Sequence, residues 1–133
     1  MKIQETLVEQ SKKILVVDDE KHMVRLMEYS LKKKGYLVDT AYNGAEALER
    51  VNVDKPDLIL LDIKMPVMNG YEVCLHLRKN PETRNIPVII VSIFADNGET
   101  ASLEVAGRIV KPFDPGKLVN QVRLTLCGER EGV

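Results

Sequence analysis

The chain has 133 residues, enough for one domain with its own core, and 44% of its residues are hydrophobic. Its 19 Lys and Arg residues nearly balance its 20 Asp and Glu residues, which leaves a formal net charge of −1 at pH 7. This balance argues against a surface built to bind nucleic acid, and the short apolar runs argue against a membrane span.

Five short apolar runs predict β-strands. In chain order they are residues 13–17 (KILVV), 36–42 (YLVDTAY), 58–61 (LILL), 88–92 (VIIVS) and 108–110 (RIV). Runs without a polar residue, such as 58–61, are typical of strands that are buried on both faces of a parallel sheet. The second run alternates more, as expected for an edge strand with one wetter face.

Helical spacing of apolar residues marks the segments between these runs. The expected helices cover residues 23–34, 43–51 and 115–126, and a further helix carries its apolar stripe at residues 73–77 and stops before Pro81. A weakly marked helix begins after Asp96. Asn43, with Glu46 three residues later, is a start signal, and so is Asp114 followed by Pro115. Gly35 directly after three lysines marks a helix end.

Strands and helices that alternate in this way predict a three-layer α/β fold. Right-handed crossovers limit the topology to a doubly wound parallel sheet, and five strands favour the flavodoxin-like order 2-1-3-4-5. Ligands then bind where the strand order reverses, at the carboxyl ends of the first and third strands. We expect one domain over residues 12–127, an N-terminal arm over residues 1–11 and a C-terminal tail over residues 128–133.

Polar side chains stand at the carboxyl ends of four of these strands. Asp18 and Asp19 follow the first strand, Asp62 follows the third, Ser92 ends the fourth and Lys111 follows the fifth. In a parallel sheet these ends share one edge, so three carboxylates would come close and repel one another. A divalent cation relieves that repulsion, and oxygen ligands favour Mg²⁺.

This set of groups suits phosphoryl transfer to a carboxylate. Asp62 would attack in line and form an acyl phosphate, while Mg²⁺ bound through Asp18, Asp19 and Asp62 would neutralise charge. Lys111 would pair with one phosphoryl oxygen, and the hydroxyl of Ser92 would hydrogen-bond another. Each residue alone has a simpler interpretation, as a helix cap, a solvated loop or a turn. Their joint placement favours the phosphoryl site.

These residues resemble the receiver domain of two-component response regulators. The matching motifs are ILVVDDE, PDLILLDIKMPVMNGYEVC, PVIIVS and VKPF, and the resemblance extends from Lys12 to Leu126. It implies that Asp62 accepts phosphate from a histidine kinase or a histidine phosphotransfer protein and thereby switches binding to an output partner. It further implies a metal ligand in the backbone carbonyl of Lys64 and a cis peptide bond before Pro112. Such a domain catalyses only its own phosphorylation and dephosphorylation, so we do not expect an enzyme.

Two residues depart from the family pattern. Ile93 follows Ser92 where the family has a very small residue, and Arg108 stands three positions before Lys111 where an aromatic residue is common. These departures leave open a receiver-like module that binds a partner without being phosphorylated. A phosphatase of the dehalogenase type is a third alternative. That family has a second acidic residue two positions after its nucleophile, where this chain has Lys64.

The remaining expectations concern partners and location. Cys74 and Cys127 lack the spacing of a metal site, so we expect reduced thiols in a cytoplasmic protein. We expect no direct binding of this chain to nucleic acid or membrane. The resemblance implies a monomer or a weak dimer, formed through the helix after Asp96, the strand at 108–110 and the last helix.

Overall fold

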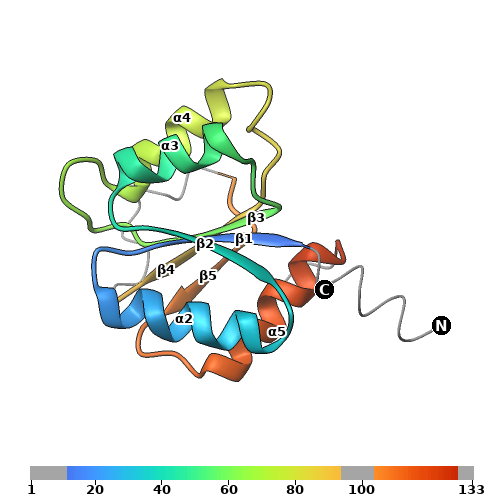
Figure 1. Ribbon diagram of the computed structural model, residues 1–133. Helices are drawn as coiled ribbons and strands as arrows, with labels where there is room; N and C mark the ends of the chain where they lie inside the picture. Colours follow the sequence, from blue (N-terminus) through green and yellow to red (C-terminus); the bar gives the residue numbers. More distant parts are fainter. Residues whose placement is uncertain (1–11, 94–103, 129–133) are drawn as a thin grey trace.

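The computed structural model describes residues 12–93 and 104–128, and these form an α/β fold (Figure 1). Five parallel strands form one sheet in the order β2-β1-β3-β4-β5, so the predicted fold class and strand order are confirmed. The strands are β1 (Lys13–Val17), β2 (Leu37–Ala41), β3 (Leu58–Leu61), β4 (Val88–Ser92) and β5 (Gly107–Val110). The helices are α2 (Lys21–Lys33), α3 (Gly44–Val53), α4 (Gly70–Lys79) and α5 (Pro115–Leu126).

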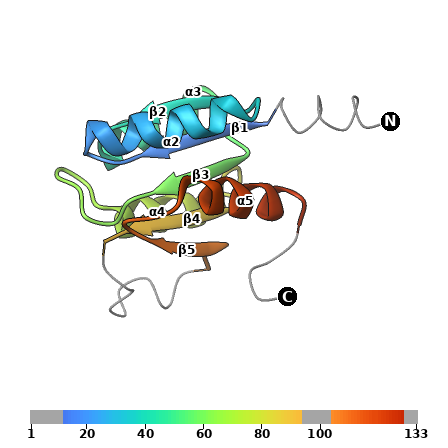
Figure 2. The same ribbon diagram turned by 90° about the horizontal axis from the view of Figure 1, so that it is seen from below.

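The sheet lies between two layers of helices. Helices α2 and α5 cover one face, and α3 and α4 cover the other (Figures 1 and 2). Successive residues of a strand point to opposite faces, and β1 supplies both cores. Ile14 and Val16 pack in the core on the side of α2 and α5, whereas Leu15 and Val17 pack in the core on the side of α3 and α4. This two-sided burial explains the unbroken apolar runs.

The two edge strands are wetter than the central ones. In β2, Leu37 is exposed and the next three residues are half-buried, as its alternating sequence predicted. In β5, Arg108 and Val110 are exposed among the described residues. The central strands β3 and β4 are buried along their whole length.

Side-chain caps fix where the helices begin. The backbone N–H of Glu46 donates to the Asn43 side chain (2.8 Å), and that of Gly116 donates to Asp114 (2.9 Å). Both predicted starts are therefore confirmed. Helix α4 begins at Gly70, several residues before the apolar stripe that predicted it, because Asn69 and Glu72 form a reciprocal capping box.

Some expectations fall on residues that are not described. The helix predicted after Asp96 lies within residues 94–103, and the arm over residues 1–11 and most of the tail lie outside the described ranges. The domain boundaries therefore stay predictions. No helix within residues 12–93 and 104–128 has the length and apolar character needed to cross a membrane.

Candidate functional site

The register of the sheet brings the predicted site residues to one edge. β1 and β3 end level with each other, and the N–H of Asp62 donates to the carbonyl of Val17 (3.0 Å). β4 and β5 also end together, and the N–H of Lys111 donates to the carbonyl of Ser92 (2.8 Å). Asp62 and Lys111 thus start the loops that leave neighbouring parts of the same edge.

Three carboxylates meet at this edge. Asp18, Asp19 and Asp62 each offer an oxygen atom, and these atoms all lie within 4.8 Å of one another. Asp18 is fully buried, Asp62 is 6% exposed, and Asp19 faces solvent. Oxygen atoms at this spacing, with one ligand open to solvent, fit a small hard cation that keeps several waters. The donor set therefore suits Mg²⁺.

Lys111 is the buried cation of the site. Its Nζ lies 2.6 Å from Oδ2 of Asp18 and 3.6 Å from Oδ2 of Asp62, and the residue is 7% exposed. Burial acts to lower the pKa of Lys111. The hydrogen bond to Asp18 and the charge of Asp62 outweigh burial, so that its pKa is raised and the ammonium group stays charged. One ammonium group facing three carboxylates still leaves an excess of negative charge.

That excess acts on Asp62. Burial, followed by the charge of Asp18, raises the pKa of Asp62 from 3.8 to about 6. The charge of Lys111 and the N–H of Ile63, which donates to Oδ1 of Asp62 at 2.8 Å, act in the opposite direction. Asp62 is therefore mostly ionised at pH 7, but its charged form is less stable than that of an ordinary aspartate. A cation between the carboxylates would reverse this penalty.

The first turn of α4 holds the backbone of Asp62. The N–H of Gly70 donates to the carbonyl of Ile63 (2.9 Å), and a Cβ on Gly70 would lie only 2.3 Å from the backbone oxygen of Asp62. Only glycine permits this approach, so Gly70 positions the carboxylate. We did not predict this role from the sequence. The signal was present, because Asn69-Gly70 followed by Glu72 is a capping-box start.

Lys64 lies on the solvent side of the site. Asp19, Lys64 and Asn69 are among the residues that line a pocket of about 410 Å³ beside the β3–α4 loop. The side chain of Lys64 is exposed. Lys64 and Asp19 thus line the same pocket, while metal coordination by the carbonyl of Lys64 stays a prediction.

The remaining predicted features lie on β4 and β5. Ser92 is buried at the end of β4, next to the backbone of Lys111, and its role toward a phosphoryl group stays a prediction. The peptide bond between Lys111 and Pro112 is cis, as predicted. Ile93 and Arg108 are both exposed.

Comparisons with known proteins agree with the family resemblance seen in the sequence. A model of the response regulator receiver domain family matches residues 14–123. The alkaline phosphatase synthesis transcriptional regulatory protein PhoP of Bacillus subtilis is 38% identical over 119 residues, which are 87% of this chain and 49% of PhoP. The response regulator PleD of Caulobacter vibrioides is 40% identical over 116 residues, which are 85% of this chain and 26% of PleD. The chain thus spans about half or less of the length of these relatives.

Solved structures of similar size also match. The signal receiver domain of a signal transduction histidine kinase from Syntrophus aciditrophicus is 30% identical, with a TM-score of 0.83. The match covers 92% of this chain and 96% of that one. The chemotaxis response regulator CheY4 of Vibrio cholerae is 30% identical, with a TM-score of 0.79, over 84% of this chain and 96% of CheY4. These matches cover nearly the whole described fold.

Proposed function

The chain belongs to the family of response regulator receiver domains, and on that premise we propose that Asp62 accepts a phosphoryl group from a histidine kinase or a histidine phosphotransfer protein. The observation that carries this proposal is the geometry of the sheet edge. A nearly buried carboxylate, Asp62, lies beside two further carboxylates and 3.6 Å from the ammonium group of Lys111. A strand and a glycine contact hold Asp62 in place, as a nucleophile requires.

The transfer follows from these groups. A carboxylate oxygen of Asp62 forms a bond to phosphorus while the P–N bond to the donor imidazole breaks. The electron pair stays on the imidazole nitrogen, which takes up a proton. Lys111 pairs with a phosphoryl oxygen and the hydroxyl of Ser92 donates to another, so that fixed charges and dipoles supply the catalysis.

Asp18, Asp19, Asp62 and the carbonyl of Lys64 would hold Mg²⁺ in this proposal. The ion would supply positive charge that offsets the charge of the phosphoryl group. The mutual closeness of the three carboxylates and the raised pKa of Asp62 support a cation at this position. With such an ion bound, the pKa of Asp62 would be lower, and Asp62 would stay ionised for attack.

Phosphorylation would change the surroundings of Lys111. Without phosphate, the Nζ of Lys111 is held by Asp18 at 2.6 Å. A phosphoryl group on Asp62 offers more negative charge to the same ammonium group and competes with Asp18 for it. Because Lys111 directly follows β5, the change would reach β5, whose Arg108 and Val110 are exposed. We propose that the face made by the helix expected after Asp96, β5 and α5 binds the output partner, and that the same face forms any weak dimer.

The chain would act as a phosphoacceptor rather than as an enzyme with a substrate of its own. It would catalyse only the gain and loss of its own phosphoryl group. We place this activity in the cytoplasm, in contact with a kinase or phosphotransfer protein.

Incubation with Mg²⁺ and a small phosphodonor, followed by intact mass measurement, tests the proposal. The wild-type chain should gain one phosphoryl group, and Asp62→Asn should gain none. Asp57→Asn, at the opposite end of β3, is a matched control that should gain the group as the wild type does. A wild-type chain that stays unmodified while it binds its partner would instead favour the receiver-like module without phosphorylation.

A further inference from the structure

A groove lies between α2 and α5. These two helices cover the sheet face opposite α3 and α4 (Figures 1 and 2). Its volume is about 740 Å³, and its lining is mainly apolar. Leu26 and Tyr29 of α2 face Pro115 and Val119 of α5 across it. Tyr29 is 66% exposed, which is unusual for a large aromatic side chain in such a seam. The groove therefore has the apolar floor that a bound segment needs.

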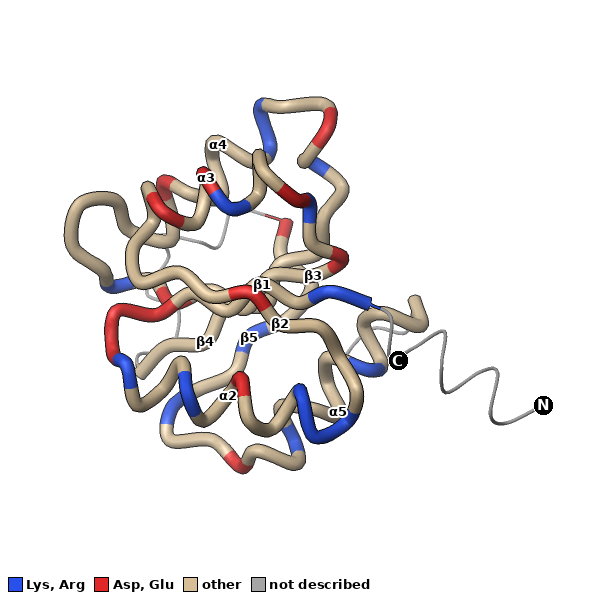
Figure 3. Tube along the Cα trace, viewed as in Figure 1, with Lys and Arg blue, Asp and Glu red and all other residues tan. Residues whose placement is uncertain are grey.

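The groove is basic at one end. Lys33 and Lys34 at the end of α2 and Arg123 of α5 line it, and none of the described residues that line it carries a carboxylate. Figure 3 shows this basic stretch where α2 ends beside α5. The Nζ of Lys33 lies 5.9 Å from the centre of the Tyr29 ring, so the cationic end adjoins the apolar floor. An occupant of matching chemistry would combine apolar and acidic side chains.

The N-terminal part of the chain joins the domain at this basic end. The N–H of Leu37 donates to the carbonyl of Lys12 (3.0 Å), and Tyr36, the residue before Leu37, lines the groove. Eleven residues can span at most about 36–40 Å when extended. The groove follows α5 from Gly116 to Arg123, a length of about 10 Å at the helical rise per residue. The preceding residues can therefore reach every part of the groove.

The composition of residues 1–11 matches this lining. Ile3, Leu7 and Val8 are apolar, and Glu5 and Glu9 are acidic. Glu9 is only three residues from Lys12 and can meet the basic end, whereas Ile3 is far enough along the chain to reach the apolar end. We propose that residues 1–11 bind in the groove between α2 and α5 of the same chain. This contact does not depend on phosphorylation of Asp62, and it would cover the groove against other partners.

Cysteine cross-linking in the full chain tests the contact. The background carries Cys127→Ser, because Cys127 is exposed directly after the end of α5. Leu7→Cys is combined with Tyr29→Cys in one chain and with Asn120→Cys in another, so that both walls of the groove are sampled. The matched control combines Leu7→Cys with Asn52→Cys, an exposed position on α3. Asn52 lies two residues before Asp54, whose carboxylate contacts Lys13, so this position is also near the attachment point.

Under mild oxidation at low protein concentration, both groove pairs should form a disulfide within one chain roughly tenfold faster than the control pair, because binding raises the local thiol concentration. Equal rates for the groove and control pairs would overturn the proposal. Disulfides between two chains would overturn it as well, and would show that a second copy fills the groove.

Charge exchange provides an independent test. Arg123→Glu should slow the linkage of the Leu7 and Tyr29 pair by roughly threefold, as expected for a surface ion pair. Adding Glu9→Lys to Arg123→Glu should restore the rate. A rate that Arg123→Glu leaves unchanged, or that Glu9→Lys slows further, would contradict the assigned contact between the arm and the basic end.

Discussion

The side chain of Asp62 meets two requirements that act against each other. In its proposed role as nucleophile, Asp62 would have to be held rigidly, and a buried strand, the Ile63 N–H and the close approach of Gly70 hold it. The same burial, together with the charge of Asp18, raises the pKa of Asp62 to about 6 and disfavours the ionised form that would attack. The ammonium group of Lys111 offsets only part of this effect. A bound cation would satisfy both requirements.

The raised pKa predicts how Asp62→Asn changes stability with pH when metal is absent. The pKa of Asp62 is about 6 in the folded chain and close to 3.8 when unfolded, so its ionisation destabilises the fold as pH rises from about 4 to above 6. Asp62→Asn removes this effect. We expect it to raise the free energy of unfolding by about 1–2 kcal/mol at pH 7, after allowance for solvent screening, and to change little at pH 4.

Denaturant unfolding in the presence of a chelator, at both pH values, measures this difference. Asp57→Asn, which removes a carboxylate at the other end of β3, is the control variant. An Asp62→Asn chain that is less stable than wild type at pH 7 would show that the carboxylate is not destabilised by its neighbours.

Val67 is a strained residue in the β3–α4 loop. Its φ is 71°, and the N–H of Met68 donates to the carbonyl of Pro66 (2.8 Å), which makes Val67 the centre of a γ-turn. A β-branched residue rarely adopts this conformation, and Val67 is 82% exposed, so its side chain gains little from packing. The strain lies in the loop between Asp62 and α4.

Val67→Gly should therefore stabilise the protein. The left-handed conformation costs an L-residue about 1–2 kcal/mol, of which the added freedom of glycine in the unfolded chain offsets about 0.5–1. We expect a net gain of about 1 kcal/mol in the free energy of unfolding, measured by urea titration. Val53→Gly, at an equally exposed valine of α3, should instead lower stability. A loss of stability with Val67→Gly would show that the loop is not strained there.

At the level of elements, the sequence predicted what depends on local patterns. The runs LILL and VIIVS identified β3 and β4, because strands buried on both faces must be apolar throughout. Asn43 and Asp114 identified helix starts, because their side chains replace missing backbone partners. The approach of α4 to the backbone of Asp62 through Gly70 was missed. It depends on how two distant segments pack, which no local pattern records.

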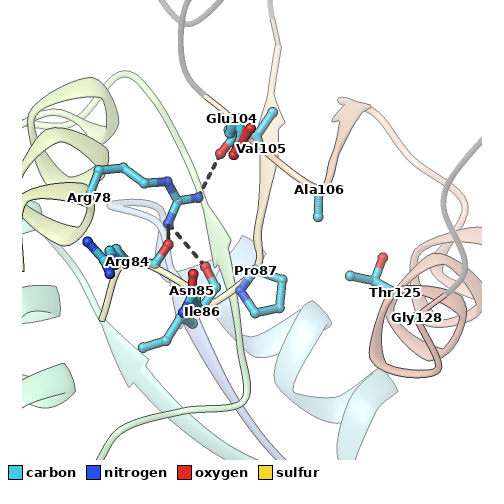
Figure 4. Close-up of a pocket in the computed structure, with 10 residues that line it drawn as sticks. All are labelled: Arg78, Arg84, Asn85, Ile86, Pro87, Glu104, Val105, Ala106, Thr125 and Gly128. Carbon is cyan, nitrogen blue, oxygen red and sulfur yellow. Dashed lines mark hydrogen bonds between the residues drawn. The ribbon is translucent and has the colours of Figure 1, made fainter. Parts of the chain in front are cut away.

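Arg78 is another long-range contact of this kind. Its Nη1 donates to the carbonyls of Arg84 (2.7 Å) and Ile86 (3.3 Å), and its Nη2 donates to that of Glu104 (2.6 Å) (Figure 4). These bonds fasten α4 to the loop before β4 and to the residues that lead into β5. The four residues joined by these bonds line a pocket of about 300 Å³ at the sheet edge away from the acidic site.

Removing this contact should destabilise the elements that it joins. Arg78→Ala leaves three carbonyls without their donor, and we expect a loss of about 2–4 kcal/mol in the free energy of unfolding. Hydrogen exchange should become faster at the N–H of Ala106, which donates to Val88 and begins the pairing of β5 with β4. Lys79→Ala, at the exposed neighbouring position of α4, is the control. Equal stability of the two variants would contradict the role of Arg78.

At the scale of the whole molecule, the topology explains why the acidic site was predictable. Parallel strands place all their carboxyl ends at one edge, so residues far apart in sequence meet once the strand order is known. The order in turn follows from right-handed crossovers. Topology does not give distances between side chains, so the 2.6 Å bond between Lys111 and Asp18 could not be predicted. The groove between α2 and α5 also depends on packing and was not predicted.

A cation at the site should stabilise the whole fold. Because Mg²⁺ would bind the folded chain only, a concentration ten times its dissociation constant should add about 1.4 kcal/mol to the free energy of unfolding. Thermal unfolding at constant ionic strength, with and without Mg²⁺, measures the gain. Asp19→Asn should reduce it, and Glu49→Gln, an exposed change on α3, should not. An equal gain in all three proteins would mean that the ion acts elsewhere.

The most direct measurement of the central claim is the position of the acyl phosphate. Borohydride reduces an aspartyl phosphate to homoserine, which marks the modified residue permanently. After phosphorylation with Mg²⁺ and a small phosphodonor, we expect peptide mass spectrometry to find homoserine at position 62, with Asp18 and Asp19 intact. Homoserine at position 18 or 19, or a phosphorylated protein without homoserine at position 62, would contradict the account.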